Sequence, residues 1–143
     1  MTYDLAIFNP ETSPKEPTEF KNWYLKQGEW TEPHDYDDPS VCTKAMRAWY
    51  LEMTNSFPDL NTVDDSVTAT EDFDLRQYMA DYSIGSQIIY VAFQWSKQKE
   101  AYDSCLKLAK KHGVVFFDVS AEIAGVYFPT NDGDLVKTFS IEW

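Results

Sequence analysis

Histidine, cysteine and glycine are scarce in this chain, and their scarcity limits the chemistry that it can support. The 143 residues include two histidines, two cysteines and five dispersed glycines. There is no nucleophile-elbow pattern and no glycine-rich loop for a phosphate or a dinucleotide. Cys42 and Cys105 lack a CxxC partner, so we expect buried free thiols in preference to a disulfide or a reactive site. These absences predict a protein that is not an enzyme, with no catalytic residue, cofactor or metal.

Long apolar runs and a basic start are missing as well. No stretch approaches the roughly 20 apolar residues that a membrane-spanning helix needs. Residues 1–8 lack the basic region and the apolar run of a signal peptide. We therefore expect a cytoplasmic protein with no membrane partner. Nucleic-acid binding is disfavoured too, because no basic track accompanies the aromatic residues.

Acidic residues, by contrast, are abundant and unevenly placed. Asp and Glu number 24 against 12 Lys and Arg, which gives a net charge of −12. Residues 1–74 hold 16 acidic and 5 basic residues, whereas residues 75–143 hold 8 and 7. Two segments, residues 29–38 and 59–74, contain no Lys or Arg. Such a surface repels nucleic acid and anionic membranes and attracts basic proteins.

The apolar pattern predicts one folded α+β domain over residues 1–143. Hydrophobic residues make up 43% of the chain and aromatic residues 16%, too many for a disordered acidic tail. Periodicity and turn signals predict the order β-α-α-β-β-α-β-β-β, which contains the split βαββαβ arrangement. The strands are expected at residues 3–8, 75–83, 88–95, 114–119, 123–128 and 138–143. The helices are expected to end near Gln27, Phe57 and His112. We predict a sandwich in which a mainly antiparallel sheet carries its helices on one face.

Because acidic residues are so common, calcium binding and carboxylate-based catalysis are the two functions to compare with simple solvation. Asp35, Asp37, Asp38 and the turn 132–134 offer oxygen ligands, but neither cluster fits the twelve-residue calcium loop. A glycosidase-like acid pair is consistent with the composition, although most surface carboxylates are simply solvated. We expect a solvated loop and a hairpin turn. His34 lies among carboxylates that favour its charged form.

Two aromatic residues, Trp30 and Tyr36, lie inside the first base-free segment. Aromatic side chains surrounded by charge are typical of the anchors in protein interfaces. The alternative is that Trp30 folds back onto the sheet and covers it as a lid.

Four segments of the predicted strands and core stand out: DYSIGSQIIYVAFQWS (81–96), AY (101–102), KHGVVFFDVS (111–120) and FKNWY (20–24). Together they resemble a family of small acidic bacterial proteins. Some members of that family are similar to immunity proteins of contact-dependent and other polymorphic toxin systems. The resemblance implies a non-enzymatic antitoxin, and it carries over no site residues.

We therefore expect an immunity protein that neutralises a basic toxin, with a nuclease as the expected class because such toxins must bind phosphates. It should be a monomer that enters a heterodimeric complex, with its carboxylates on the toxin's lysines and arginines. The expected partner-binding residues are Glu29, Trp30, Glu32, Asp35, Tyr36, Asp37, Asp38, Asp64, Asp65, Glu71, Asp72 and Asp74. Two alternatives stay open: a small-molecule-binding domain with an aromatic pocket between sheet and helices, and, less favoured, a carboxylate-based hydrolase.

Overall fold

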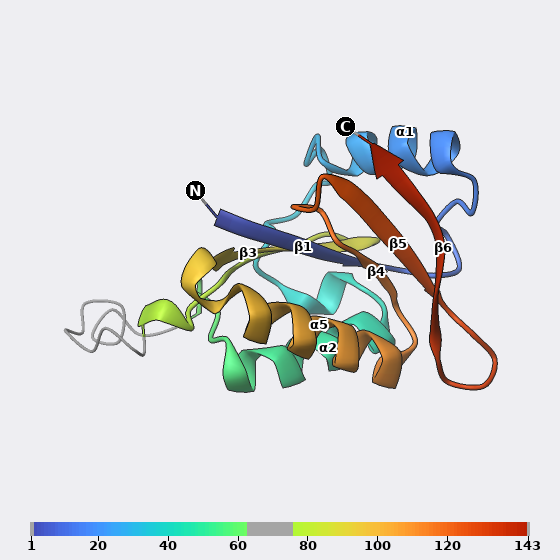
Figure 1. Ribbon diagram of the computed structural model, residues 1–143. Helices are drawn as coiled ribbons and strands as arrows, with labels where there is room; N and C mark the ends of the chain where they lie inside the picture. The colour runs from blue at the N-terminus through green and yellow to red at the C-terminus, as the bar shows by residue number, and fades with distance from the viewer. Residues whose placement is uncertain (1, 63–75, 143) are drawn as a thin grey trace.

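A single antiparallel sheet organises the computed structural model, which describes residues 2–62 and 76–142 (Figure 1). Its strands are β1 (Thr2–Phe8), β2 (Asp81–Ile84), β3 (Ile88–Gln94), β4 (Val115–Phe117), β5 (Ile123–Pro129) and β6 (Leu135–Glu142). The spatial order is β2-β3-β1-β4-β5-β6, and every neighbouring pair is antiparallel. The first strand of the chain therefore lies inside the sheet, while β2 and β6 form its edges.

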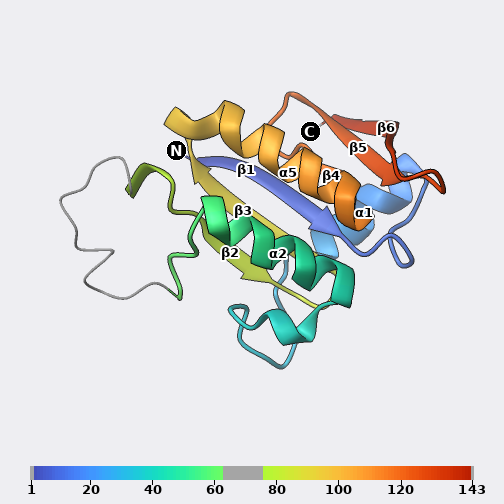
Figure 2. The same ribbon diagram turned by 90° about the horizontal axis from the view of Figure 1, so that it is seen from below.

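Helices cover both faces of this sheet. On one face, α2 (Lys44–Ser56) and α5 (Gln98–His112) lie side by side, as Figures 1 and 2 show. The indole N–H of Trp49 in α2 donates to the Cys105 carbonyl in α5 at 3.2 Å. On the other face, α1 (Pro17–Gln27) presses Phe20 against the ring of Phe8, with the centroids 5.4 Å apart.

The predicted fold class and element order are confirmed: the protein is α+β, with an antiparallel sheet and the order β-α-α-β-β-α-β-β-β. One detail differs, because the helices do not share one face. The residues of β1 explain this. Leu5 and Ile7 pack with α2 and α5, whereas Ala6 and Phe8 pack on the α1 side. A strand that is apolar on both faces needs cover on both.

Caps and short turns set where the helices begin, and two strands begin at other residues than expected. The first helix begins at Pro17, because the Glu16 carboxylate accepts the N–H groups of Thr18 and Glu19. The second helix is preceded by a separate 3₁₀ turn, η1 (Pro39–Val41), and another, η2 (Trp95–Lys97), precedes α5. β2 begins at Asp81, six residues later than expected, and β6 begins three residues earlier, at Leu135.

The thiols of Cys42 and Cys105 are free and buried, as predicted. Burial raises the pKa of both thiols, which makes them poor nucleophiles. Among the helices of the described residues, none combines the length and the apolar character required to cross a membrane.

Candidate functional site

The outer edge of β2 receives the first base-free acidic segment and the first residues of the second. The Ile84 N–H donates to the Tyr36 carbonyl at 2.8 Å, so the first segment runs beside one end of β2. Asp59 forms a parallel bridge with Ala80, and the Leu60 N–H donates to the Ala80 carbonyl at 2.9 Å. The second segment therefore starts beside the other end, about 13 Å away at strand spacing. Figure 2 shows the first segment, in cyan, on the outer side of β2.

Tyr50 of α2 holds the first residue of the second segment. The Tyr50 hydroxyl in α2 donates to Asp59 Oδ2 at 2.7 Å. Burial, that bond and the charge of Asp59 raise the pKa of Tyr50, and the charge of Asp37 adds to the effect. Of the second segment, Asp64, Asp65, Glu71, Asp72 and Asp74 lie outside the described residues.

Glu32 ties the first acidic segment to the turn between β2 and β3. Its carboxylate accepts the Ser86 N–H at 3.1 and 3.3 Å and faces His34 Nε2 at 2.7 Å. A Cβ added at Gly85 would lie 2.9 Å from Glu32 Oε2, so the close approach of this carboxylate favours glycine. Glu32 therefore positions the segment, and its carboxylate is already engaged within the protein.

His34 lies between two hydrogen-bond acceptors inside this segment. Its Nδ1 lies 2.9 Å from the Asp35 carbonyl oxygen, and its Nε2 faces the Glu32 carboxylate at 2.7 Å. Because a carbonyl and a carboxylate accept hydrogen bonds, this geometry favours the imidazolium form, in which both ring nitrogens donate. The bonds to Asp35 and then to Glu32 raise the pKa of His34. Burial alone would raise the pKa of Glu32, but the bonds from His34 and Ser86 lower it.

Trp30 and Tyr36 fold inward instead of projecting from the segment. The Tyr36 ring lies 5.0 Å from the Trp30 ring, edge to face, and 5.0 Å from the His34 ring. The Tyr36 hydroxyl accepts the Glu32 N–H at 2.7 Å. Trp30 is half-buried against the apolar cluster on the α1 face. This is the arrangement in which Trp30 acts as a lid on the sheet.

The carboxylates that remain available to a partner are fewer than the sequence alone indicates. Glu29, Asp35 and Asp37 are exposed. Asp38 is exposed too, but its carboxylate accepts the Ser40 N–H at 2.9 Å and caps η1. Among the described residues, Glu29, Asp35 and Asp37 form no ion pair. Asp35 and Asp37 flank Tyr36 at the β2 edge, and Glu29 lies between Gly28 and Trp30; we call these three exposed acids the acidic rim.

An aromatic cavity of about 450 Å³ opens next to this rim. Its lining comes from the end of α1, the acidic segment and the strands β2 and β3: Tyr24, Leu25, Gly28, Trp30, Ser83, Ile88 and Tyr90. The Tyr90 hydroxyl donates to the Asp4 carboxylate. Burial, assisted by the charge of Asp4, raises the pKa of Tyr24 to about 12. Tyr24, Tyr90 and Asp4 were not singled out from the sequence, because each looks like an ordinary core or strand position.

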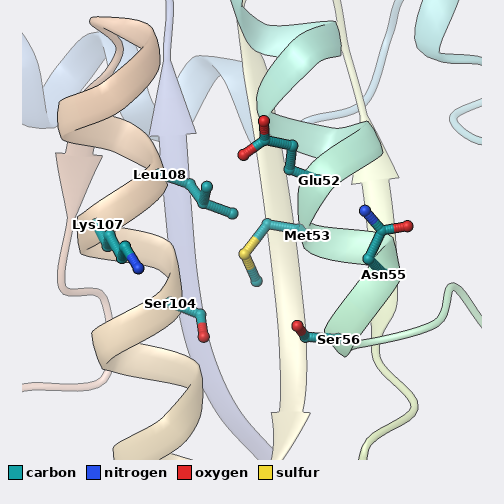
Figure 3. Close-up of a pocket in the computed structure, with 7 residues that line it drawn as sticks. All are labelled: Glu52, Met53, Asn55, Ser56, Ser104, Lys107 and Leu108. Carbon is teal, nitrogen blue, oxygen red and sulfur yellow. The ribbon is translucent and has the colours of Figure 1, made fainter.

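A second hollow, of about 340 Å³, lies between α2 and α5 (Figure 3). Met53 and Leu108 contribute its apolar part, while Ser104 and Lys107 face it from α5. The Glu52 carboxylate on its rim is engaged by the Lys111 ammonium at 2.6 Å. No residue here was singled out from the sequence, and the hollow presents no convergent set of free polar groups.

Within residues 2–62 and 76–142, no three His, Cys, Asp or Glu side chains are grouped so that they could hold a metal ion. The fold and the site together define a small α+β protein with an acidic sheet edge beside an aromatic cavity. Comparisons with models of known families, with curated proteins and with solved structures found no match to this chain.

Proposed function

We propose that this protein is a non-enzymatic inhibitor, an immunity protein of the cytoplasm that binds and neutralises a basic toxin. The observation that carries the proposal is the acidic rim at the β2 edge. Glu29, Asp35 and Asp37 are exposed there, and Asp35 and Asp37 flank Tyr36, whose carbonyl accepts the Ile84 N–H of β2. A nuclease domain is the partner that fits best, because its cleft must present lysines and arginines to phosphates.

Charge complementarity makes such a rim an effective capture surface. Opposite charges steer the encounter of two proteins and raise association rates to about 10⁸–10⁹ M⁻¹s⁻¹ at low salt. The rim is also held in place, because Glu32 fastens its segment to the β2–β3 turn. A carboxylate surface that is already ordered loses less conformational entropy on binding.

The test is the association rate with the toxin encoded beside this protein, measured for a rim variant carrying Glu29→Gln, Asp35→Asn and Asp37→Asn. We expect association at low salt to slow by about tenfold or more, with a much shallower salt dependence. The control carries Glu100→Gln, Asp103→Asn and Glu122→Gln, which remove the same charge from exposed positions elsewhere.

Equal slowing of both variants would mean that only total charge matters, and would refute a docking rim. An unchanged rate for the rim variant would refute it as well.

The aromatic cavity supports a second candidate function, the binding of a small molecule. Its volume of about 450 Å³ falls in the range of specific ligand pockets. A bound metabolite should raise the melting temperature of the protein, because ligands that bind only the folded state stabilise it. In a thermal-shift screen with a metabolite panel, a true ligand should lose its effect on a Trp30→Leu variant. A panel without any stabilising compound would count against this function.

A further inference from the structure

The α1 face of the sheet is covered unevenly. Over β1, β4 and β6, α1 packs Phe20 against Phe8, Phe117 and Phe139, with ring centroids 5.3–5.4 Å apart. Over β2 and β3, the cover comes from Trp30. The aromatic cavity is the space between this indole, the end of α1 and the sheet.

Trp30 reaches this position through an unusual backbone conformation. Its φ is +52°, in the left-handed region that bulky residues rarely adopt. The Trp30 N–H donates to the Gln27 carbonyl at 3.3 Å, and the Tyr36 ring supports the indole from behind. Strained residues of this kind persist where the surrounding structure enforces them, and they gather at binding sites. Here the strain directs the indole over the sheet.

The chemistry of the cavity favours a cation. Three aromatic rings, those of Tyr24, Trp30 and Tyr90, come from three separate elements, and aromatic faces attract positive charge. The Asp4 carboxylate accepts a hydrogen bond from the Tyr90 hydroxyl. No Lys or Arg lines the cavity, and Lys26 of α1 lines a neighbouring hollow with Glu32.

We propose that this cavity receives an arginine side chain of the protein partner, an inference that rests on the inhibitor function proposed above. Arginine fits better than lysine, because a planar guanidinium stacks on aromatic faces and is less strongly hydrated. Glu29 of the acidic rim lies between the lining residues Gly28 and Trp30, so a negative charge borders this contact. The partner thus supplies the anchor, and Trp30 and Tyr36 build the receiving site.

The first measurement needs no partner. The full chain is titrated with Nα-acetyl-arginine N-methylamide while the indole N–H signal of Trp30 is followed by NMR, with Trp30→Phe identifying that signal. The matched probe is the citrulline derivative, which has nearly the same shape and no charge. We expect a saturable shift with arginine and at least about tenfold weaker binding of citrulline. Equal binding of the two probes, or no binding of arginine, overturns the proposal.

The second measurement uses one variant that leaves the cavity walls in place, Asp4→Asn, and one that removes a wall, Trp30→Leu. Asp4→Asn removes the charge behind Tyr90 and should weaken binding of the arginine probe several-fold, whereas Glu122→Gln, a remote exposed acid, should not change it. Trp30→Leu should abolish binding of the probe, with circular dichroism verifying its fold. If that variant unfolds, Asp4→Asn still decides the outcome, because an unchanged affinity refutes cation selection.

The partner itself separates this inference from the function on which it rests. Asp4→Asn and Trp30→Leu should speed dissociation of the toxin complex, while the rim variant should slow its formation. A cavity that ignores the arginine probe overturns the inference and leaves the inhibitor proposal standing. A second outcome also overturns the inference: the cavity binds the arginine probe, but neither cavity variant changes the dissociation rate of the toxin complex. The cavity would then bind a free cation and not a side chain of the partner.

Discussion

At the scale of the residue, Glu32 shows how a carboxylate inside an acidic segment can serve the fold. From the composition alone, Glu32 counts as one more surface charge. In the structure it accepts the Ser86 N–H and holds His34, and its removal would release the segment from the β2–β3 turn. The neighbouring Glu29 is exposed and forms no ion pair within the described part of the chain. Two acids three residues apart therefore have different roles.

Glu32→Gln should lower the pKa of His34 toward its usual range and reduce the free energy of unfolding by about 1 kcal/mol, because a charged acceptor is lost at a partly exposed site. The pKa of His34 is raised on folding and that of Glu32 is lowered. The stabilisation is therefore full between the ordinary pKa values of about 4.5 and 6.5, and it declines on either side.

NMR titration of the His34 ring and urea unfolding from pH 4 to 8 would measure both effects. Glu29→Gln is the control, since it removes the same charge from the same segment without removing a hydrogen bond. The same His34 titration and unfolding curve in both variants would contradict this role of Glu32.

At the scale of the element, the connection between α2 and β2 depends on a buried acid. Asp59 accepts the Tyr50 hydroxyl at 2.7 Å and the Asn61 N–H at 2.9 Å, and its residue is only 1% exposed. Burial raises the pKa of Asp59, although both of those bonds act against the rise. These contacts close the base of the second acidic segment and hold it beside Ala80.

Asp59→Asn should change how stability depends on pH. In the wild type the folded state binds the Asp59 proton more tightly than the unfolded state, so stability falls as the pH rises from about 3.8 through the raised pKa. The variant lacks this decline. Between pH 4 and pH 7, the free energy of unfolding of the variant, measured in urea, should therefore rise relative to that of the wild type.

Asp103→Asn, at an exposed position of α5, is the reference for an ordinary carboxylate. A constant difference between Asp59→Asn and wild type across this pH range would contradict a raised pKa at Asp59.

At the scale of the whole molecule, the net charge of −12 opposes folding, and under the proposed function it also attracts a basic partner. Like charges repel most strongly in the compact state, and salt screens that repulsion. The excess lies in the first half of the chain, and the structure brings part of it to one sheet edge. We expect that edge to be the main source of the repulsion.

Raising NaCl from 0.02 to 0.3 M should therefore raise the melting temperature by roughly 4 °C, which corresponds to about 1 kcal/mol in a domain of this size. The rim variant, with three charges removed from the β2 edge, should show a clearly smaller rise in calorimetry. The variant with Glu100, Asp103 and Glu122 neutralised should keep most of it. Identical salt responses in the two variants would place the repulsion elsewhere.

Much of this site was beyond prediction from the sequence because its parts come from distant positions. The base-free segments are visible in the chain, and so are the aromatic residues inside the first of them. The cavity is not, since Tyr24 of α1, Trp30 of the first acidic segment and Tyr90 of β3 are distant in the sequence and are brought together only by the tertiary fold. The bond between Tyr90 and Asp4 spans 86 residues, and no local pattern signals it.

The sequence by itself determined the kinds and order of the elements, the antiparallel α+β class and the acidic excess. Each of these depends on periodicity, turn residues or charge, which are local properties of the chain. Only the tertiary structure decided the strand order, the placement of α1 opposite α2 and α5, the gathering of acidic segments at β2 and the inward turn of Trp30. Those depend on long-range pairings, such as Phe8 with Ile88 and Ala6 with Phe117, and competition among packings of the whole chain selects them.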